Sequence, residues 1–386
     1  MPATQTPTTA PGIMPATASV QPPQKGPLSF RTSTLRKVEQ SVQSSLVMTA
    51  AQQLVNNVLE GTGFLTSVDL EVIATTAANV AVVANQPDAP WSALGNVVLK
   101  ALGPDVVNLT GYGLYLLNLY GGFGLTNPAL STDTNIYNVV TGVGGGVGGS
   151  FRFPLNIPIS INDRSFLGLL GNQDRATKYE LRTDLAPDTA LYSTLPTTDP
   201  SVIINRTLNY CTVPSAQNDA GQAQQQLPPH YGVVHMMTQL TSETQPTTGA
   251  TLNHFLRSIG NTIRHIGLVF RTGAAGNPRS DTMLPSKITF KVGSDTLFSE
   301  SGAHRRQEMY KRYQFDAPAG VIWYDFCRDF GRSVGYELGD DWLNTRDIAN
   351  AQFEITWPTF AGGAGQLQII TDSLVIPAGM DISRMV

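Results

Sequence analysis

The sequence predicts an all-β protein built from two tandem β-sandwich domains. At 386 residues the chain is too long for one compact core of ordinary size. Charged residues make up 14% of it, against about 25% in a typical soluble protein, and 36 glycines and 25 prolines supply many turns. Few charges, many turn formers and abundant β-branched residues favour short strands joined by long loops.

The N-terminal segment, residues 1–60, is expected to stand apart from the sandwiches. Residues 1–24 carry no charged side chain and are rich in Pro, Thr, Ala and Gln, which predicts an extended arm that lies against something outside its own fold. From Thr34 to Leu59 apolar residues recur at steps of three to five. That spacing predicts one amphipathic helix or two shorter ones. The sequence leaves open whether this helix packs against its own domain, a membrane or a neighbouring subunit.

Residues 61–214 are expected to form the first sandwich. Alternating and apolar runs predict its strands at 64–74, 79–85, 96–102, 106–110, 114–120, 151–161, 178–183 and 202–213. The Gly- and Asn-rich stretch 125–150 predicts a long excursion, in which Gly144, Gly146 and Gly149 have the spacing of a dinucleotide-binding loop. Such a loop must open a helix, whereas Phe151–Pro154 follows here, so we expect a packed or flexible loop.

A polar stretch without periodicity, residues 215–226, marks the predicted linker to a second sandwich at 227–386. Strands of this second set are expected at 231–240, 263–271, 288–292, 321–326, 352–357 and 366–376. Segment 97–105 weakly echoes segment 288–295, each being a strand followed by a Gly-x-Asp turn. An echo over this distance indicates a duplicated domain.

No catalytic residue, cofactor or metal site is expected from the sequence. Cys211 and Cys327 cannot make a disulfide framework and are expected to be buried, reduced thiols of a protein made in a cytoplasm. The five histidines lack zinc-binding spacing and are expected to form hydrogen bonds in the core or at the surface. No G-x-S-x-G motif, signal peptide or membrane-spanning run is found.

Two basic groups are the candidate contact sites. The first group is Lys25, Arg31, Arg36 and Lys37. It suits an anionic partner such as a lipid surface, and equally the solvated start of a helix. The second group is Arg305, Arg306, Lys311 and Arg312, which interleave with tyrosines. Such a pattern can bind nucleic acid, but the net charge of −4 favours a solvated or inter-subunit face. Its expected acidic partners are Asp325, Asp329, Glu337, Asp340 and Asp341.

Two stretches carry a resemblance to a known family. In residues 63–118 a strand pair and a loop precede the segment LTGYGLYLLN, and in residues 305–339 the basic group precedes an acidic residue, Ala-Pro-Ala-Gly, an aromatic strand and an acidic hairpin. In both the chain resembles the double jelly-roll major capsid proteins of tailless icosahedral, tectivirus-like viruses and phages. The resemblance covers about residues 61–386, as a pattern of strands and turns.

This resemblance implies two eight-stranded jelly rolls per subunit and three subunits per capsomer, giving a pseudo-hexagonal footprint. Capsomers would tile an icosahedral virion shell, usually over an internal membrane. The implied partners are two further copies of the chain, neighbouring capsomers, other virion proteins and membrane lipids, with no specific nucleic acid. Two alternatives stay open. One is another virion component, such as a spike or vertex protein. The other is a carbohydrate-binding sandwich or secreted hydrolase, which the lack of a signal peptide disfavours.

Overall fold

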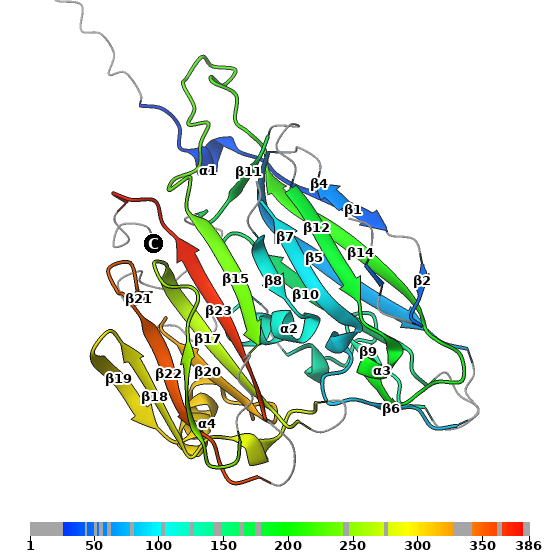
Figure 1. Ribbon diagram of the computed structural model, residues 1–386. Coiled ribbons are helices and arrows are strands. Elements are labelled where there is room, and N and C mark those ends of the chain that lie inside the picture. Colours follow the sequence, from blue (N-terminus) through cyan, green and yellow to red (C-terminus); the bar gives the residue numbers. More distant parts are fainter. Residues whose placement is uncertain are drawn as a thin grey trace, which may run out of the picture.

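The fold was obtained as a computed structural model. It describes residues 26–380 except 43–44, 50–51, 54–56, 60–62, 78–80, 102–104, 124–126, 143–147, 162–165, 174–178, 242–246, 274–276, 328–341 and 361–364. Strands dominate this part of the chain, and they form two sandwiches that lie side by side (Figure 1). The prediction of an all-β protein with two sandwiches is therefore confirmed.

One large sheet belongs to the first sandwich. Its described strands are β1 (Arg36–Val42), β14 (Ser201–Cys211), β5 (Gly63–Thr75), β10 (Phe151–Pro158) and β9 (Asn138–Val139) in spatial order, with β2 (Leu46–Val47) paired to β14 and β11 (Leu170–Asn172) paired to β5. Along β5 buried side chains alternate with less buried ones from Ser67 onward. This alternation arises because successive residues of a strand point to opposite faces.

A second large sheet runs through both sandwiches. Its described strands are, in spatial order, β20 (Val321–Asp325), β17 (Thr262–Arg271), β23 (Gln366–Val375), β15 (Val234–Thr241), β8 (Asp105–Leu109), β7 (Leu94–Lys100), β12 (Tyr179–Leu185) and β3 (Gln52–Gln53), with β21 (Leu343–Asn344) paired to β17 and β4 (Asn57–Leu59) paired to β12. The two sandwiches meet where β15 pairs with β8 in parallel. The other pairings are antiparallel, as hairpins and jelly rolls require.

A smaller sheet closes the second sandwich. Its described strands are β16 (Thr251–Phe255), β22 (Ala351–Thr356), β18 (Lys287–Val292) and β19 (Asp295–Glu300). The short pair β6 (Ala84–Asn85) and β13 (Tyr192–Thr194) lies in the first half. Helical segments of the described chain are α1 (Phe30–Ser33), α2 (Gly111–Tyr120), α3 (Asp188–Leu191), α4 (Gly302–Tyr313) and the 3-10 turns η1 (Trp91–Ala93), η2 (Pro128–Leu130) and η3 (Asp281–Met283).

Each sandwich has a hydrophobic core, and the core of the first extends across the joint to side chains of the second half such as Met237 and Trp323. The first core joins side chains of β5, β10 and β14 with those of β7, β8 and β12. The second joins β17, β20 and β23 with β16, β18 and β22. Strand β17 is buried along its whole length because it lies between two neighbouring strands and is covered on both faces. Gly267 lets it pack closely, since a Cβ there would lie 2.3 Å from the ring of Trp323.

The predicted helix over residues 34–59 is wrong. Residues 36–42 form β1, which pairs with β14 from Arg36↔Cys211 to Val42↔Asn205, and the described residues that follow form β2, β3 and β4. Apolar side chains on the predicted helical face remain exposed, Val38 at 69% and Val42 at 70%. Spacing of three to five residues had indicated a helix, but the backbone of this segment pairs with neighbouring strands instead.

Two further segments differ from their predicted form. Residues 114–120, predicted as a strand, lie in α2, whose Thr110 side chain accepts a hydrogen bond from the Gly113 amide at 3.0 Å and caps the helix. Because nearly every side of α2 is buried, its sequence is apolar throughout, and such a short run cannot distinguish strand from helix. Within 79–85 only Ala84–Asn85 is a strand among the described residues.

Side chains fasten the two sandwiches together at α2. Tyr120 stacks on Trp323 of the second half with 5.2 Å between ring centroids. The Gln239 side chain accepts hydrogen bonds from Thr110, at 3.2 Å from its amide and 3.0 Å from its hydroxyl. Nearby, Asp88 of the first half accepts from Arg271 and Arg279 of the second. The joint therefore combines a continuous sheet with aromatic and charged contacts.

Candidate functional site

The second basic group lies on helix α4. Ser301 caps the helix by accepting from the His304 amide at 3.1 Å, and Gln314 ends it in the left-handed conformation. The sequence pattern predicted no helix between residues 292 and 321. Lys311 and Arg312 occupy the last turn, where cations are favoured by the exposed carbonyl ends of the helix.

The arginines of α4 bind their own chain. Arg305 donates to the Trp323 carbonyl at 3.0 and 2.9 Å, and its guanidinium lies 4.5 Å from the centre of the Tyr324 ring. Arg306 donates to Asp281 and to the Ala317 carbonyl. Both side chains thus fix α4 against the strand and turn that follow it.

The predicted acidic partners of this group are partly in place. Arg312 forms an ion pair with Asp325 at 2.9 Å, as expected. Lys311 instead pairs with Glu308 one turn earlier, at 2.6 Å, and its side chain is 69% exposed. Hydrogen bonding to Lys311 lowers the pKa of Glu308. The other expected partners, Asp329, Glu337, Asp340 and Asp341, lie outside the described residues.

The first basic group is distributed over α1 and β1. Arg31 lies in α1, and Arg36 and Lys37 lie on β1, all three exposed. Lys25 lies outside the described residues. β1 is the last described strand at its edge of the first sheet, so no other described strand pairs with its outer side. The interpretation of this group as an anionic-partner contact stays a prediction.

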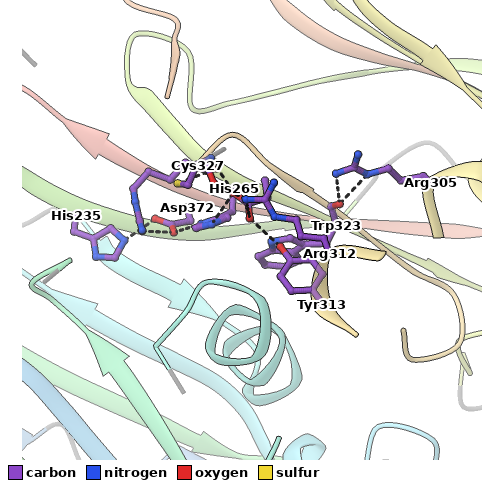
Figure 2. Close-up of polar contacts among 10 residues, drawn as sticks. His235, His265, Arg305, Arg312, Tyr313, Trp323, Cys327 and Asp372 are labelled. Carbon is purple, nitrogen blue, oxygen red and sulfur yellow. Dashed lines mark hydrogen bonds and ion pairs between the residues drawn. The ribbon is translucent and has the colours of Figure 1, made fainter. Parts of the chain in front are cut away.

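A buried charged cluster, which the sequence did not predict, lies in the second sandwich next to the joint (Figure 2). Asp372 on β23 is fully buried and forms three polar contacts, with His235 Nε2 at 2.6 Å, His265 Nδ1 at 2.7 Å and Arg264 Nη1 at 2.8 Å. The Arg264 guanidinium also lies 5.4 Å from the Phe123 ring centre and 5.8 Å from that of Trp342. Three neighbouring strands thus place their polar side chains around one carboxylate.

Asp325 at the end of β20 is the second carboxylate of the cluster. It accepts from the Tyr313 hydroxyl at 3.0 Å and the Cys327 amide at 2.8 Å, besides pairing with Arg312. His265 Nε2 faces its Oδ1 at 3.5 Å. The strand register explains the arrangement, because His265 is directly opposite Asp325 on one side and Asp372 on the other.

These contacts shift the proton affinities of the cluster. Burial alone disfavours the charged form of Asp372, but Arg264, His235 and the hydrogen bonds of both histidines outweigh it and hold its pKa well below the ordinary value. Burial likewise disfavours charge on His265, yet Cys327, Asp325 and Asp372 raise its pKa well above the ordinary value. The two carboxylates therefore favour the protonated form of His265.

Sequence reasoning identified some members of this cluster individually but did not place them together. It expected hydrogen-bonding histidines, and His235 and His265 are hydrogen-bonded; it expected buried reduced thiols, and Cys327 and Cys211 are buried without a disulfide. Asp372 was missed, because the cluster joins residues more than one hundred positions apart through strand pairing. A charged residue in the middle of the predicted strand 366–376 is the signal that could have indicated it.

Two other candidate sites offer little support for ligand chemistry. Gly149 precedes strand β10 and not a helix, while Gly144 and Gly146 lie outside the described residues. A surface hollow of about 280 Å³ is lined largely by apolar side chains of the first half. Its Asp69 already accepts from Asn156 and Asn209. Among the described helices, none has the length and apolar character needed to span a bilayer.

Comparison with known proteins places this fold. No family model and no curated protein sequence matches the chain. Solved structures do match. The STIV MCP superposes with a TM-score of 0.61 at 13% identity, over 89% of this chain and 100% of that one. The capsid of PBCV-1 virus superposes with a TM-score of 0.61 at 16% identity, over 88% of this chain and 93% of that one. The major capsid protein P2 from bacteriophage PM2 superposes with a TM-score of 0.51 at 10% identity, over 89% of this chain and 99% of that one.

These structures are similar to almost the whole of this chain, across both sandwiches and the sheet that joins them. Identities of 10% to 16% establish the fold alone. The chain has the double jelly-roll fold of viral major capsid proteins, as its sequence pattern had indicated.

Proposed function

We propose that this chain is a major capsid protein, without enzymatic activity, that assembles as a homotrimer in the shell of an icosahedral virion. The observation that carries the proposal is the similarity in fold to capsid proteins along nearly the full length of both partners. Three copies, each with two sandwiches side by side, give six lobes and therefore a pseudo-hexagonal capsomer. Such capsomers would contact one another and other virion proteins.

The division of the chain at residues 215–226 belongs to this proposal, with a first roll at 61–214, to whose sheets the earlier strands β1 to β4 add, and a second roll at 227–386. The second roll holds one main hydrophobic core entirely, and most side chains of the other core lie in the first roll. The β8–β15 pair, which crosses the boundary, supports a subunit that moves as one block. A rigid two-lobed subunit suits a shell, because a fixed lobe spacing is what lets capsomers tile.

The composition also suits assembly. Low charge reduces repulsion between copies, and stable obligate interfaces bury about 2,000 Å² or more with apolar centres. Exposed apolar side chains of the first half supply such surface, Leu35 at 66% exposed and Val38 and Val42 at 69% and 70%. They lie on or beside the edge strand β1.

The test of the proposal is the native mass of the purified full-length chain at micromolar concentration, combined with negative-stain microscopy. We expect a trimer with a hexagonal outline. A strictly monomeric mass would refute the capsomer. Where source particles exist, the chain should be their most abundant protein, whereas a minor band would indicate a spike or vertex component instead.

The contact predicted for α4 is tested at Lys311. Substituting any of its arginines would break bonds within the subunit, whereas Lys311 is largely exposed and its ion pair with Glu308 is weakened by solvent screening. Lys311→Glu should weaken trimers or shells without changing the melting temperature of the subunit. Lys287→Glu, at an exposed position on β18, is the control. Equal assembly of both variants would exclude α4 as an interface.

The proposal also includes an internal membrane beneath the capsid shell. It would place the first basic group against lipid headgroups, where each cation contributes about 1 kcal/mol. Replacing Lys25, Arg31, Arg36 and Lys37 together with Gln should abolish flotation with anionic vesicles. Lys100→Gln, at an exposed position in β7, should not. Flotation of the quadruple variant at the wild-type level would remove this group from any membrane contact.

A further inference from the structure

We propose that His265, Asp325 and Cys327 form a binding site for one Zn²⁺ ion. One nitrogen, one oxygen and one sulfur from these residues lie within 4.8 Å of one another. The site is enclosed, with the His265 and Asp325 side chains each 3% exposed and Cys327 5% exposed. This inference is independent of the proposed capsid function, because it concerns the interior of a single subunit.

The strands bring the three donors together. His265 on β17 is directly opposite Asp325 on β20, and Cys327 follows two residues later, where β20 has ended. The Cys327 amide donates to Asp325 Oδ1 at 2.8 Å, so the chain turns back on the carboxylate and brings the thiol to the same side. The donors come from two strands separated by about sixty positions, so no short motif marks them in the sequence.

The histidine is oriented as a metal ligand would be. Asp372 Oδ2 lies 2.7 Å from His265 Nδ1. Because a carboxylate accepts, Nδ1 donates, and the opposite nitrogen, Nε2, faces Asp325 Oδ1 at 3.5 Å. Metal-binding histidines commonly donate their second ring N–H to a carboxylate, which fixes the ring and its tautomer. Asp372 is in turn held by His235 and Arg264, so this outer support is rigid.

The separation of the donors suits tetrahedral zinc. His265 Nε2 lies 3.5 Å from Asp325 Oδ1, which is long for a hydrogen bond. Two ligands at about 2.0–2.2 Å from a tetrahedral Zn²⁺ are themselves about 3.3–3.5 Å apart. All three donors lie within 4.8 Å of one another, so the Cys327 sulfur needs to approach by about 1 Å at most to complete a triangle around zinc. Arg312 forms an ion pair with Asp325 Oδ2, so Oδ1 is the carboxylate oxygen that would bind the metal.

The charges around the site select the metal and its remaining ligand. Arg264 and Arg312 already balance Asp372 and Asp325. The charge of an entering dication is therefore met by Cys327 as a thiolate and by hydroxide or another small anion at the fourth position. Zinc binding releases the thiol proton and any proton on His265 Nε2. Mixed nitrogen, oxygen and sulfur donors suit Zn²⁺, whereas Mg²⁺ and Ca²⁺ prefer oxygen alone.

The experiment measures zinc bound to the purified full-length chain. The protein is stripped with a chelator, incubated with zinc chloride, desalted and analysed for metal by mass spectrometry. We expect about one zinc per chain, and a thiolate-to-metal charge-transfer band when cobalt replaces zinc. Both should vanish in Cys327→Ser and fall strongly in His265→Gln. Cys211→Ser is the matched control, since Cys211 is equally buried but lies in a separate apolar cluster.

Zinc and cobalt binding by the wild-type chain tests the proposal even if a variant fails to fold. Absence of retained zinc and of the cobalt charge-transfer band in the wild type would overturn the proposal. So would a band that persists in folded Cys327→Ser, or one that is lost in folded Cys211→Ser. These outcomes are separate from those for the capsid, because a trimer without zinc, or a zinc-binding monomer, would refute only one of the two proposals.

Discussion

Replacing Asp372 with Asn should strongly destabilise the second sandwich. Asn keeps the shape of the side chain but removes the negative charge that Arg264 pairs with at 2.8 Å, in a place where both side chains are fully buried. Breaking a buried ion pair by removing one partner costs about 3–5 kcal/mol, because the other charge is left without compensation. The aromatic rings beside Arg264 cannot supply a full opposite charge.

The magnitude can be checked by thermal unfolding of the full-length chain, followed by circular dichroism. For a cooperative unit of 150–250 residues, 1 kcal/mol lowers the midpoint by about 2–4 °C, so Asp372→Asn should lower it by about 6–20 °C. Asp295→Asn, at an exposed position on β19, is the control and should change stability by less than about 0.5 kcal/mol. If the thermal midpoint of Asp372→Asn lies within about 2 °C of the wild-type midpoint, the reasoning is refuted.

Two further substitutions probe the joint and the packing of β17. Asp88→Asn should cost about 3 kcal/mol and increase protease cleavage between the halves, because it leaves Arg271 and Arg279 without their carboxylate. Gly267→Ala should cost about 1–3 kcal/mol, measured by chemical denaturation, because the added methyl group would overlap the Trp323 ring.

Matched substitutions separate these effects from general sensitivity. Asp219→Asn removes the charge of an exposed carboxylate, and protease resistance should stay at the wild-type level. Gly95→Ala adds a methyl group with 3.6 Å to its nearest neighbour, an ordinary contact, and should be nearly neutral. If Asp88→Asn matches Asp219→Asn, the charged contact does not hold the halves together. If Gly267→Ala matches Gly95→Ala, β17 has more room than its packing indicates.

Strand periodicity predicted most of the sheet framework. Runs such as 64–74, 263–271 and 366–376 became β5, β17 and β23 within a few residues, because alternation or continuous apolar character follows directly from the faces a strand buries. Where that signal was weak the prediction failed. Residues 36–42 have helical spacing but form β1, and residues 114–120 are apolar enough for a strand but lie in the buried helix α2.

For the candidate sites too, the sequence revealed single residues and only the structure revealed their contacts. The sequence showed a basic group at residues 305–312, but only the structure showed that Arg305, Arg306 and Arg312 are used to hold α4 against its own subunit. It showed five separate histidines and two cysteines, but not that His265, Asp325 and Cys327 meet. Proximity of that kind depends on strand register, which is set by packing of the whole sheet.

By itself, the sequence determined the all-β class, the two sandwiches and the resemblance to capsid proteins, because these depend on local alternation, turn chemistry and composition. Only the tertiary structure decided that one sheet runs through both sandwiches, that β1 closes an edge instead of forming a helix, and that a charged cluster surrounds Asp372. The physical reason is that backbone pairing and burial of charge are settled between residues far apart in the chain, and no window of sequence contains both partners.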